Sequence, residues 1–152
     1  MINLKQKLLR LGLNLPSAPT PVGAYSATIR SKNLLYISGQ LPFKNSKLIY
    51  KGKIGQDLTI EEGYEAAKLC ALNILSQMEN NLQENTFKRI IKIEGFINCN
   101  NSFEQHAKVL DGASDLLSKL FFKKAEHVRT VVGCNSLPLN AAIEITALVE
   151  IY

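Results

Sequence analysis

The chain has 152 residues, of which 46% are hydrophobic and 20% are charged, which is the size and composition of one ordinary globular domain. Its net charge of +5 is modest and its basic residues are dispersed, so the charge does not indicate a nucleic-acid-binding protein. No apolar run approaches the roughly 20 residues that a membrane span needs, which argues against a membrane protein.

Residues 1–15 are predicted to form a short helical extension of a single domain that covers residues 1–152. Apolar residues recur at the spacing of an amphipathic helix, and Gly12 is expected to end it. The segment lacks the uninterrupted apolar region of a signal peptide. The apolar positions are Ile2, Leu4, Leu8, Leu9 and Leu11.

The three cysteines, Cys70, Cys99 and Cys134, are scattered along the chain and form no C-x-x-C pair. No histidine lies at zinc-ligand spacing from them, so we expect no metal site. An odd, scattered set is typical of reduced and packed thiols, and it predicts a cytoplasmic protein. We interpret Cys134 as a packing residue rather than a nucleophile, because no histidine is placed by the sequence pattern to activate it.

Three prolines between positions 16 and 21 hold the next segment extended, as far as Tyr25. A hairpin is predicted after it, with strands over residues 26–30 and 33–38 joined by a tight turn. A further short strand is predicted over residues 48–50.

The second strand of this hairpin ends in the triplet Ser38-Gly39-Gln40. A glycine in such a place lets a ligand approach the backbone closely, or it marks a bulge in the strand. The sequence by itself leaves both interpretations open.

Thr59 and Glu62 form a capping box, which predicts a helix from there to about Asn80. Residues 87–99 alternate as a long strand, with Ile90 on the face opposite to the other isoleucines. The residues on that other face are Ile91, Ile93, Gly95 and Ile97.

A second capping box is predicted over residues 102–105, opening another helix. The apolar residues of this helix recur at helical spacing and should face the core. They are Leu110, Ala113, Leu117, Leu120 and Phe121.

The last segment is predicted to be a hairpin, with strands over 130–134 and 143–151 and a loop that contains Pro138. Arg129 lies at the mouth of the first strand, and Glu144 lies just inside the second on its polar face. Both charges can border one cleft. The alternative is that Arg129 is a solvated strand end and Glu144 an ordinary outward residue, and this feature alone does not decide between them.

The order of elements predicts an α/β fold in which a mixed sheet is backed on one face by two long helices, with a short N-terminal helix in addition. The other face of the sheet still carries isoleucine and valine. We therefore expect another subunit to cover that face.

Three segments carry a resemblance to a known family: residues 21–26, residues 35–42 with their S-G-Q-x-P motif, and residues 128–145. In the last of these, an arginine, a Leu-Pro pair and a glutamate follow the spacing R-(x)7-L-P-(x)5-E. The chain resembles the reactive intermediate deaminase family (RidA or YjgF, also called endoribonuclease L-PSP or chorismate-mutase-like) from Pro19 to its C-terminus. The N-terminal helix resembles a longer branch of that family.

The resemblance implies a chorismate-mutase-like sandwich, three copies of which pack into a trimer with ligand clefts between neighbours. It implies that Arg129 clamps a substrate carboxylate and that Glu144 orients a water molecule. Ser38 and Gly39 would offer the ligand-binding backbone segment. Tyr25 would come from the adjacent subunit.

Two positions depart from the pattern of the family's deaminases. Val131 stands where they often have cysteine, and it keeps the backbone N–H that contacts the ligand. Ala107 stands where they often have asparagine, so a side-chain contact to the substrate is lost.

The implied reaction is the hydrolysis of a reactive 2-imino acid to a 2-keto acid and ammonia, with no metal and no organic cofactor. The ligand would be a small-molecule carboxylate and the assembly a homotrimer. The rival interpretation is a non-catalytic trimer with a sensing role, which needs Arg129 to bind a carboxylate but does not need Glu144. A third, RNA cleavage, rests on the family label alone, because neither His106 nor His127 belongs to a recognisable acid–base pair.

Overall fold

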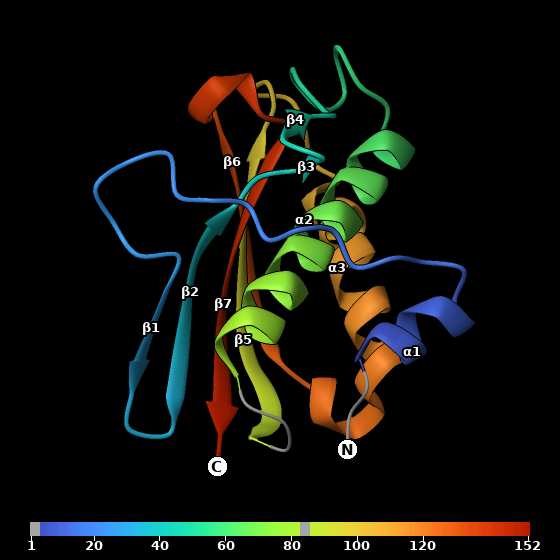
Figure 1. The fold of residues 1–152 in the computed structure, drawn as a ribbon. Helices are drawn as coiled ribbons and strands as arrows, with labels where there is room; N and C mark the ends of the chain where they lie inside the picture. The colour runs from blue at the N-terminus through green and yellow to red at the C-terminus, as the bar shows by residue number, and fades with distance from the viewer. Residues whose placement is uncertain (1–3, 83–85) are drawn as a thin grey trace.

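The computed structural model describes residues 4–82 and 86–152, so Ile2 of the predicted N-terminal helix lies outside the described residues. A five-stranded mixed sheet forms one layer and helices cover one of its faces (Figure 1). The predicted fold class is therefore confirmed. The strands follow the spatial order β1 (Thr28–Ser31), β2 (Leu34–Gln40), β7 (Ile143–Ile151), β5 (Phe87–Asn98) and β6 (Val128–Cys134).

Two long helices, α2 (Ile60–Asn81) and α3 (His106–Phe121), pack side by side on the sheet, and α1 (Leu4–Arg10) lies against α3. The N-terminal helix is confirmed, with Leu4 and Leu8 buried. Gly12 ends it in the left-handed region, at φ +69°. The remaining elements are short: β3 (Phe43–Lys44), β4 (Lys47–Leu48) and the 3₁₀ turns η1 (Phe122–Ala125) and η2 (Pro138–Asn140).

The predicted helix starts had different outcomes. At α2 the capping box is confirmed, because the Thr59 side chain accepts from the Glu62 N–H and the Glu62 carboxylate accepts from the Thr59 N–H. The second capping box is wrong, since α3 begins only at His106. Ser102 does not cap α3, because its N–H and its hydroxyl both donate to the Asn100 side-chain oxygen.

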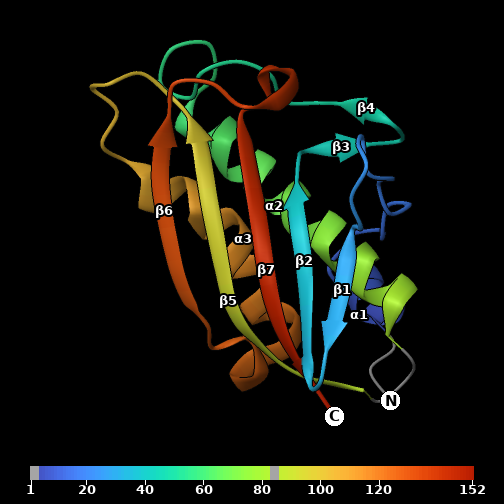
Figure 2. The ribbon, with the colours of Figure 1, turned by 90° about the vertical axis from the view of Figure 1, so that its left-hand side faces the viewer.

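The first predicted hairpin is confirmed as the antiparallel pair β1 and β2. The last predicted hairpin is wrong, because β5 lies between β6 and β7 (Figure 2). The helical crossover through α3 places β6 parallel to β5, at the edge of the sheet. The connection after β6 is long enough to pass the end of β5, where the Asn98 N–H donates to the Ala142 carbonyl at 2.9 Å.

The predicted facing of the long strand is wrong at one point. The register between β5 and β7 shifts between Ile90 and Lys92, which indicates a bulge. Ile90 is therefore fully buried, as Ile93 is, whereas Ile91 is only partly buried. The apolar residues predicted for α3 are all buried, as expected.

The face of the sheet opposite the helices is uncovered and carries apolar side chains. One row crosses all five strands at the same level, and it consists of Ile29, Tyr36, Leu148, Lys92 and Val128. Ile29 is 60% exposed, Tyr36 48% and Val128 66%. Four of these five side chains are apolar, and Lys92 is the charged one.

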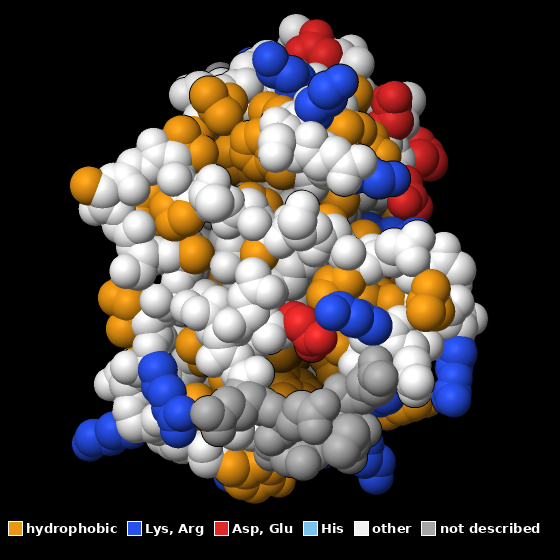
Figure 3. Space-filling view, in the orientation of Figure 1, with side chains coloured by type: hydrophobic (Ala, Val, Ile, Leu, Met, Phe, Trp, Pro, Cys, Tyr) orange, Lys and Arg blue, Asp and Glu red, His pale blue; other side chains and the backbone are white. Residues whose placement is uncertain are grey.

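Charged side chains of both signs are interspersed on the face shown in Figure 3, and the described residues there form no continuous basic patch. Among the described residues, no helix is both long enough and apolar enough to cross a membrane.

The contact between α2 and α3 is close at Gly112, where an added Cβ atom would lie 1.9 Å from the Tyr64 backbone oxygen. We expect Gly112→Ala to destabilise the fold by about 1–3 kcal/mol, because backbone atoms cannot move aside as a side chain can. The gain in helix propensity from alanine, about 1 kcal/mol, offsets only part of this effect. Urea denaturation measures the change, with Ser118→Ala on an exposed position of α3 as the control. An unchanged midpoint for Gly112→Ala would contradict the close contact.

Candidate functional site

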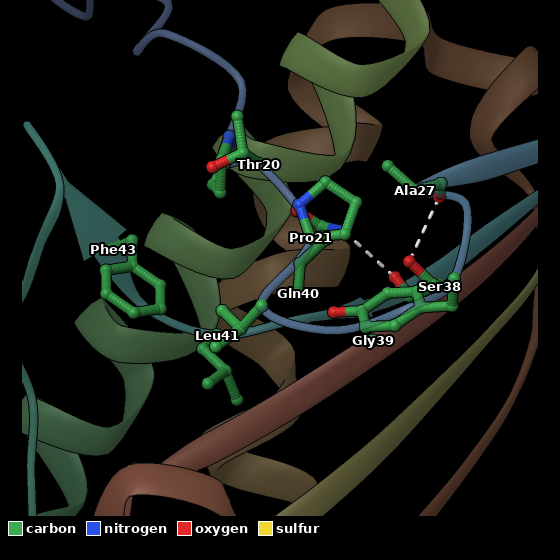
Figure 4. Close-up of a pocket in the computed structure, with 11 residues that line it drawn as sticks. Thr20, Pro21, Ala27, Ser38, Gly39, Gln40, Leu41 and Phe43 are labelled. Carbon is green, nitrogen blue, oxygen red and sulfur yellow. Dashed lines mark hydrogen bonds between the residues drawn. The ribbon is translucent and has the colours of Figure 1, made fainter.

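The extended segment before β1 and the end of β2 enclose a small pocket of about 40 Å³ (Figure 4). Three of the predicted site residues, Tyr25, Ser38 and Gly39, line it together in one chain. The segment is held against α2, where the Ser76 hydroxyl donates to the Pro16 carbonyl and the Gln77 amide to the Pro19 carbonyl, each at 2.7 Å. The other lining residues are Pro19, Thr20, Pro21, Val22, Ala27, Gln40, Leu41 and Phe43.

The Ser38-Gly39-Gln40 triplet is a bulge, since the register between β2 and β7 shifts there. Two hydrogen bonds hold the bulge: the Ser38 hydroxyl donates to the Ala27 carbonyl at 3.0 Å, and the Gln40 amide donates to the Ser38 carbonyl at 3.1 Å (Figure 4). In this chain it is a carboxylate that approaches the glycine. An added Cβ on Gly39 would lie 1.8 Å from Oε1 of Glu144.

The Glu144 side chain leaves β7 on the uncovered face of the sheet and ends at Gly39. Within the described residues, its carboxylate has no hydrogen bond and no ion pair. Burial raises the pKa of the Glu144 carboxyl above its ordinary value of 4.5. A carboxylate with a raised pKa and no partner is suited to accept a proton from water.

We expect Glu144→Gln to be more stable than the wild type at neutral pH. Because the folded-state pKa is raised, the protonated form contributes stability that is fully present below the unfolded-state pKa and is lost as pH rises through the folded-state pKa. Glutamine mimics the protonated form at every pH, so the advantage should disappear below about pH 4. Urea denaturation at fixed protein concentration over a pH series measures this. A variant that is less stable at neutral pH would show that the carboxylate makes stabilising contacts.

Arg129 lies elsewhere, on the face of the sheet that the helices cover. Its NH1 group donates to Oδ1 of Asp111 at 2.8 Å and to the Ser114 hydroxyl at 3.1 Å, both on α3. Ser114 in turn lies 3.0 Å from Nε2 of His127. Asp111 and Ser114 were missed in the sequence because they become neighbours of Arg129 only through the crossover that docks α3 on β6.

One chain does not bring Arg129 and Glu144 together. Arg129 is level with Ile93 on β5, whereas Glu144 is level with Phe96 and therefore leaves the opposite face. Val131 follows Arg129 on the helix-covered face, where it packs against the core. The single chain thus holds the six predicted residues in two separate places. Tyr25, Ser38, Gly39 and Glu144 lie at or beside the pocket. Arg129 and Val131 lie on the edge strand β6.

A second, more open pocket of about 220 Å³ lies where β5 and β6 end and α3 begins. Nε2 of His106 lies 3.7 Å from Sγ of Cys99, a contact that the sequence did not reveal. Burial raises the pKa of the Cys99 thiol, which keeps it protonated and poorly nucleophilic.

Ala107 lies in the first turn of α3 and is exposed. Among the residues that the structure describes, no group of three or more His, Cys, Asp or Glu side chains could hold a metal ion.

Comparison with known proteins gives close matches over nearly the whole chain. A family model described as "YjgF/chorismate_mutase-like, putative endoribonuclease" matches residues 5–151. Protein TCP17 of Trypanosoma cruzi is 40% identical over 146 residues, which are 95% of this chain and 91% of that protein. The crystal structure of Atu1372 from Agrobacterium tumefaciens, a protein described as having unknown function, gives a TM-score of 0.91 at 38% identity and covers 98% of this chain and 92% of that one. A 2-iminobutanoate/2-iminopropanoate deaminase of Dermatophagoides farinae is 26% identical over 140 residues, which are 91% of this chain and 94% of that protein.

Proposed function

The chain belongs to the YjgF/chorismate mutase-like family, and from that membership we propose that it hydrolyses reactive 2-imino acids to 2-keto acids and ammonia. The observation that carries the proposal is the half-buried Glu144 carboxylate, which rests without a partner among the described residues against Gly39 beside the pocket. The deaminase of Dermatophagoides farinae supports the reaction class.

The reaction needs a positioned water molecule and one proton acceptor. Glu144 accepts a proton from water as the water oxygen bonds to the imine carbon. Glu144 returns this proton to the nitrogen, which gives a carbinolamine that carries a hydroxyl and an amino group. Glu144 then takes the proton of the carbinolamine hydroxyl and passes it to the nitrogen as the carbon–nitrogen bond breaks, so that ammonia leaves and the carbonyl forms. The imine carbon is already electrophilic, so holding the reactants in place supplies most of the acceleration.

The carboxylate clamp is Arg129 of a neighbouring copy. Arg129 leaves the face opposite to Glu144 and lies on β6, the strand at the edge of the sheet, where it can meet a second copy. The row of four apolar side chains and Lys92 on the uncovered face supports such an assembly, and the family resemblance favours a homotrimer. Val131, two residues along the same edge strand, would offer its backbone N–H to the ligand beside Tyr25, Ser38 and Gly39.

The partner that follows from this site is a small-molecule carboxylate, a 2-imino or 2-keto acid. No step of the reaction calls on a cofactor. The free cysteines Cys70, Cys99 and Cys134 support the reducing, cytoplasmic compartment that the sequence predicts.

The test is an assay in which an amino-acid oxidase generates the imine in the presence of the protein. We expect the wild type to consume the imine faster than it decays spontaneously. A protein that binds 2-keto acids but gives only the spontaneous rate would instead be the non-catalytic carboxylate-binding trimer, and the deaminase proposal would be abandoned.

A further inference from the structure

We propose that Arg129 and Asp111 together recognise a zwitterion, a ligand that carries a carboxylate and a protonated nitrogen on adjacent carbons. This inference rests on the proposed role of Arg129 as the carboxylate clamp. It assigns the bound substrate as the iminium form of the 2-imino acid, and it adds Asp111 to the ligand-binding residues.

The guanidinium of Arg129 has one occupied end and one free edge. Both N–H bonds of NH1 are used, one by Asp111 and one by Ser114. Its Nε and NH2 groups have no hydrogen-bonding partner among the described residues. Those two nitrogens form the edge that grips a carboxylate through two parallel hydrogen bonds.

Ser114 and His127 fix the occupied end. Nδ1 of His127 bonds to the Ala125 carbonyl, which can only accept, so Nδ1 carries the hydrogen. In the neutral ring Nε2 is therefore an acceptor, and the Ser114 hydroxyl donates to it at 3.0 Å. The lone pairs of Ser114 are left for the Arg129 N–H, so a ligand meets a guanidinium that is already oriented.

Asp111 presents a second charge at NH1, the nitrogen that adjoins the free edge of the same guanidinium. Its Oδ1 accepts from Arg129, while its Oδ2 has no partner among the described residues. The Asp111 side chain is 45% exposed and that of Arg129 is 29% exposed, so a ligand can reach both. A ligand with only a negative charge would be attracted by Arg129 but repelled by Asp111. A zwitterion matches both charges, since its protonated nitrogen can donate to Oδ2 while its carboxylate lies on the guanidinium edge.

The test is a calorimetric titration with two acids that share the carboxylate and the ethyl group and differ at C2. 2-Aminobutanoate carries a protonated amine there, and 2-ketobutanoate carries a carbonyl. We expect Asp111→Asn to weaken the binding of 2-aminobutanoate by about tenfold or more, while 2-ketobutanoate binds as tightly as before or more tightly. A residue that only positions Arg129 would weaken both ligands alike, and that result would overturn the inference.

Asp115→Asn is the matched control. It removes the same charge one turn further along α3, at a carboxylate that accepts from the Tyr64 hydroxyl at 2.9 Å. The ratio of the two affinities should stay at the wild-type value in this variant. An equal change of the ratio in both aspartate variants would show a general charge effect and would also overturn the inference.

Arg129→Ala separates this inference from the proposed function. Loss of binding of both acids in Arg129→Ala, with an unchanged affinity ratio in Asp111→Asn, would leave the clamp standing and remove only the zwitterion preference. If Arg129→Ala binds 2-ketobutanoate as the wild type does, the clamp itself is wrong. Wild-type protein that binds neither acid would overturn both.

Discussion

Replacing Glu144 by glutamine is expected to lower the turnover of 2-imino acids by about 10²- to 10⁴-fold. Glutamine keeps the shape of the side chain against Gly39, but it cannot accept the proton of the attacking water. Binding of 2-ketobutanoate should persist, because only the handling of water has changed. The two measurements are the rate of imine consumption and a calorimetric titration of the same variant.

The control for this prediction is Glu94→Gln on the same uncovered face. Glu94 is already paired, with Lys92 at 2.6 Å and the Thr146 hydroxyl at 3.2 Å, and these contacts lower the pKa of its carboxyl. We expect this variant to keep the wild-type rate. If Glu144→Gln also keeps it, Glu144 is not the proton acceptor and the proposed mechanism fails.

Two variants that are each inactive are expected to restore activity when they assemble together. Arg129→Ala retains Glu144, and Glu144→Gln retains Arg129. Because these two side chains leave opposite faces of one chain, we propose that each complete site takes one residue from each of two neighbouring copies. A mixed assembly can then contain sites in which both residues are intact.

Random mixing in equal amounts predicts about one quarter of the wild-type rate, since half of the copies supply Arg129 and half of their neighbours supply Glu144. The experiment unfolds and refolds the two variants together and compares the imine-consumption rate with that of each variant refolded alone. If both residues of a site came from one chain, every mixed site would lack one of them. Mixed assemblies that stay as inactive as the separate variants would exclude the inter-subunit site.

Local patterns predicted most of the elements correctly. The capping box at Thr59 fixed the start of α2, because a hydroxyl and a carboxylate three residues apart satisfy both ends of the first turn. The first hairpin is likewise local, since its strands are joined by a tight turn that forces them to pair.

The errors concern contacts between distant parts of the chain. The sequence suggested that the strands around Arg129 and Glu144 form a hairpin, whereas the crossover through α3 separates them by β5. The bulge at Ile90 could not be predicted either, because a register shift depends on the partner strand and not on the alternation within β5. For the same reason the sequence identified Arg129 but not its hydrogen-bonding partners on α3, which are Asp111 and Ser114.

Gly112, which lies between Asp111 and Ser114 on α3, determines which residues around Arg129 can be replaced without moving the helix. At Gly112 the backbone of α3 meets the backbone of α2 with no room for any side chain, so the height and rotation of α3 are pinned there. Positions 111 and 114 project from the pinned turn toward β6. A protein engineer can therefore exchange the polar groups around Arg129 one at a time while the helix that carries them keeps its place. Within residues 111–114, Gly112 therefore holds the helix in place, while Asp111 and Ser114 supply the polar groups that can be changed to alter ligand specificity.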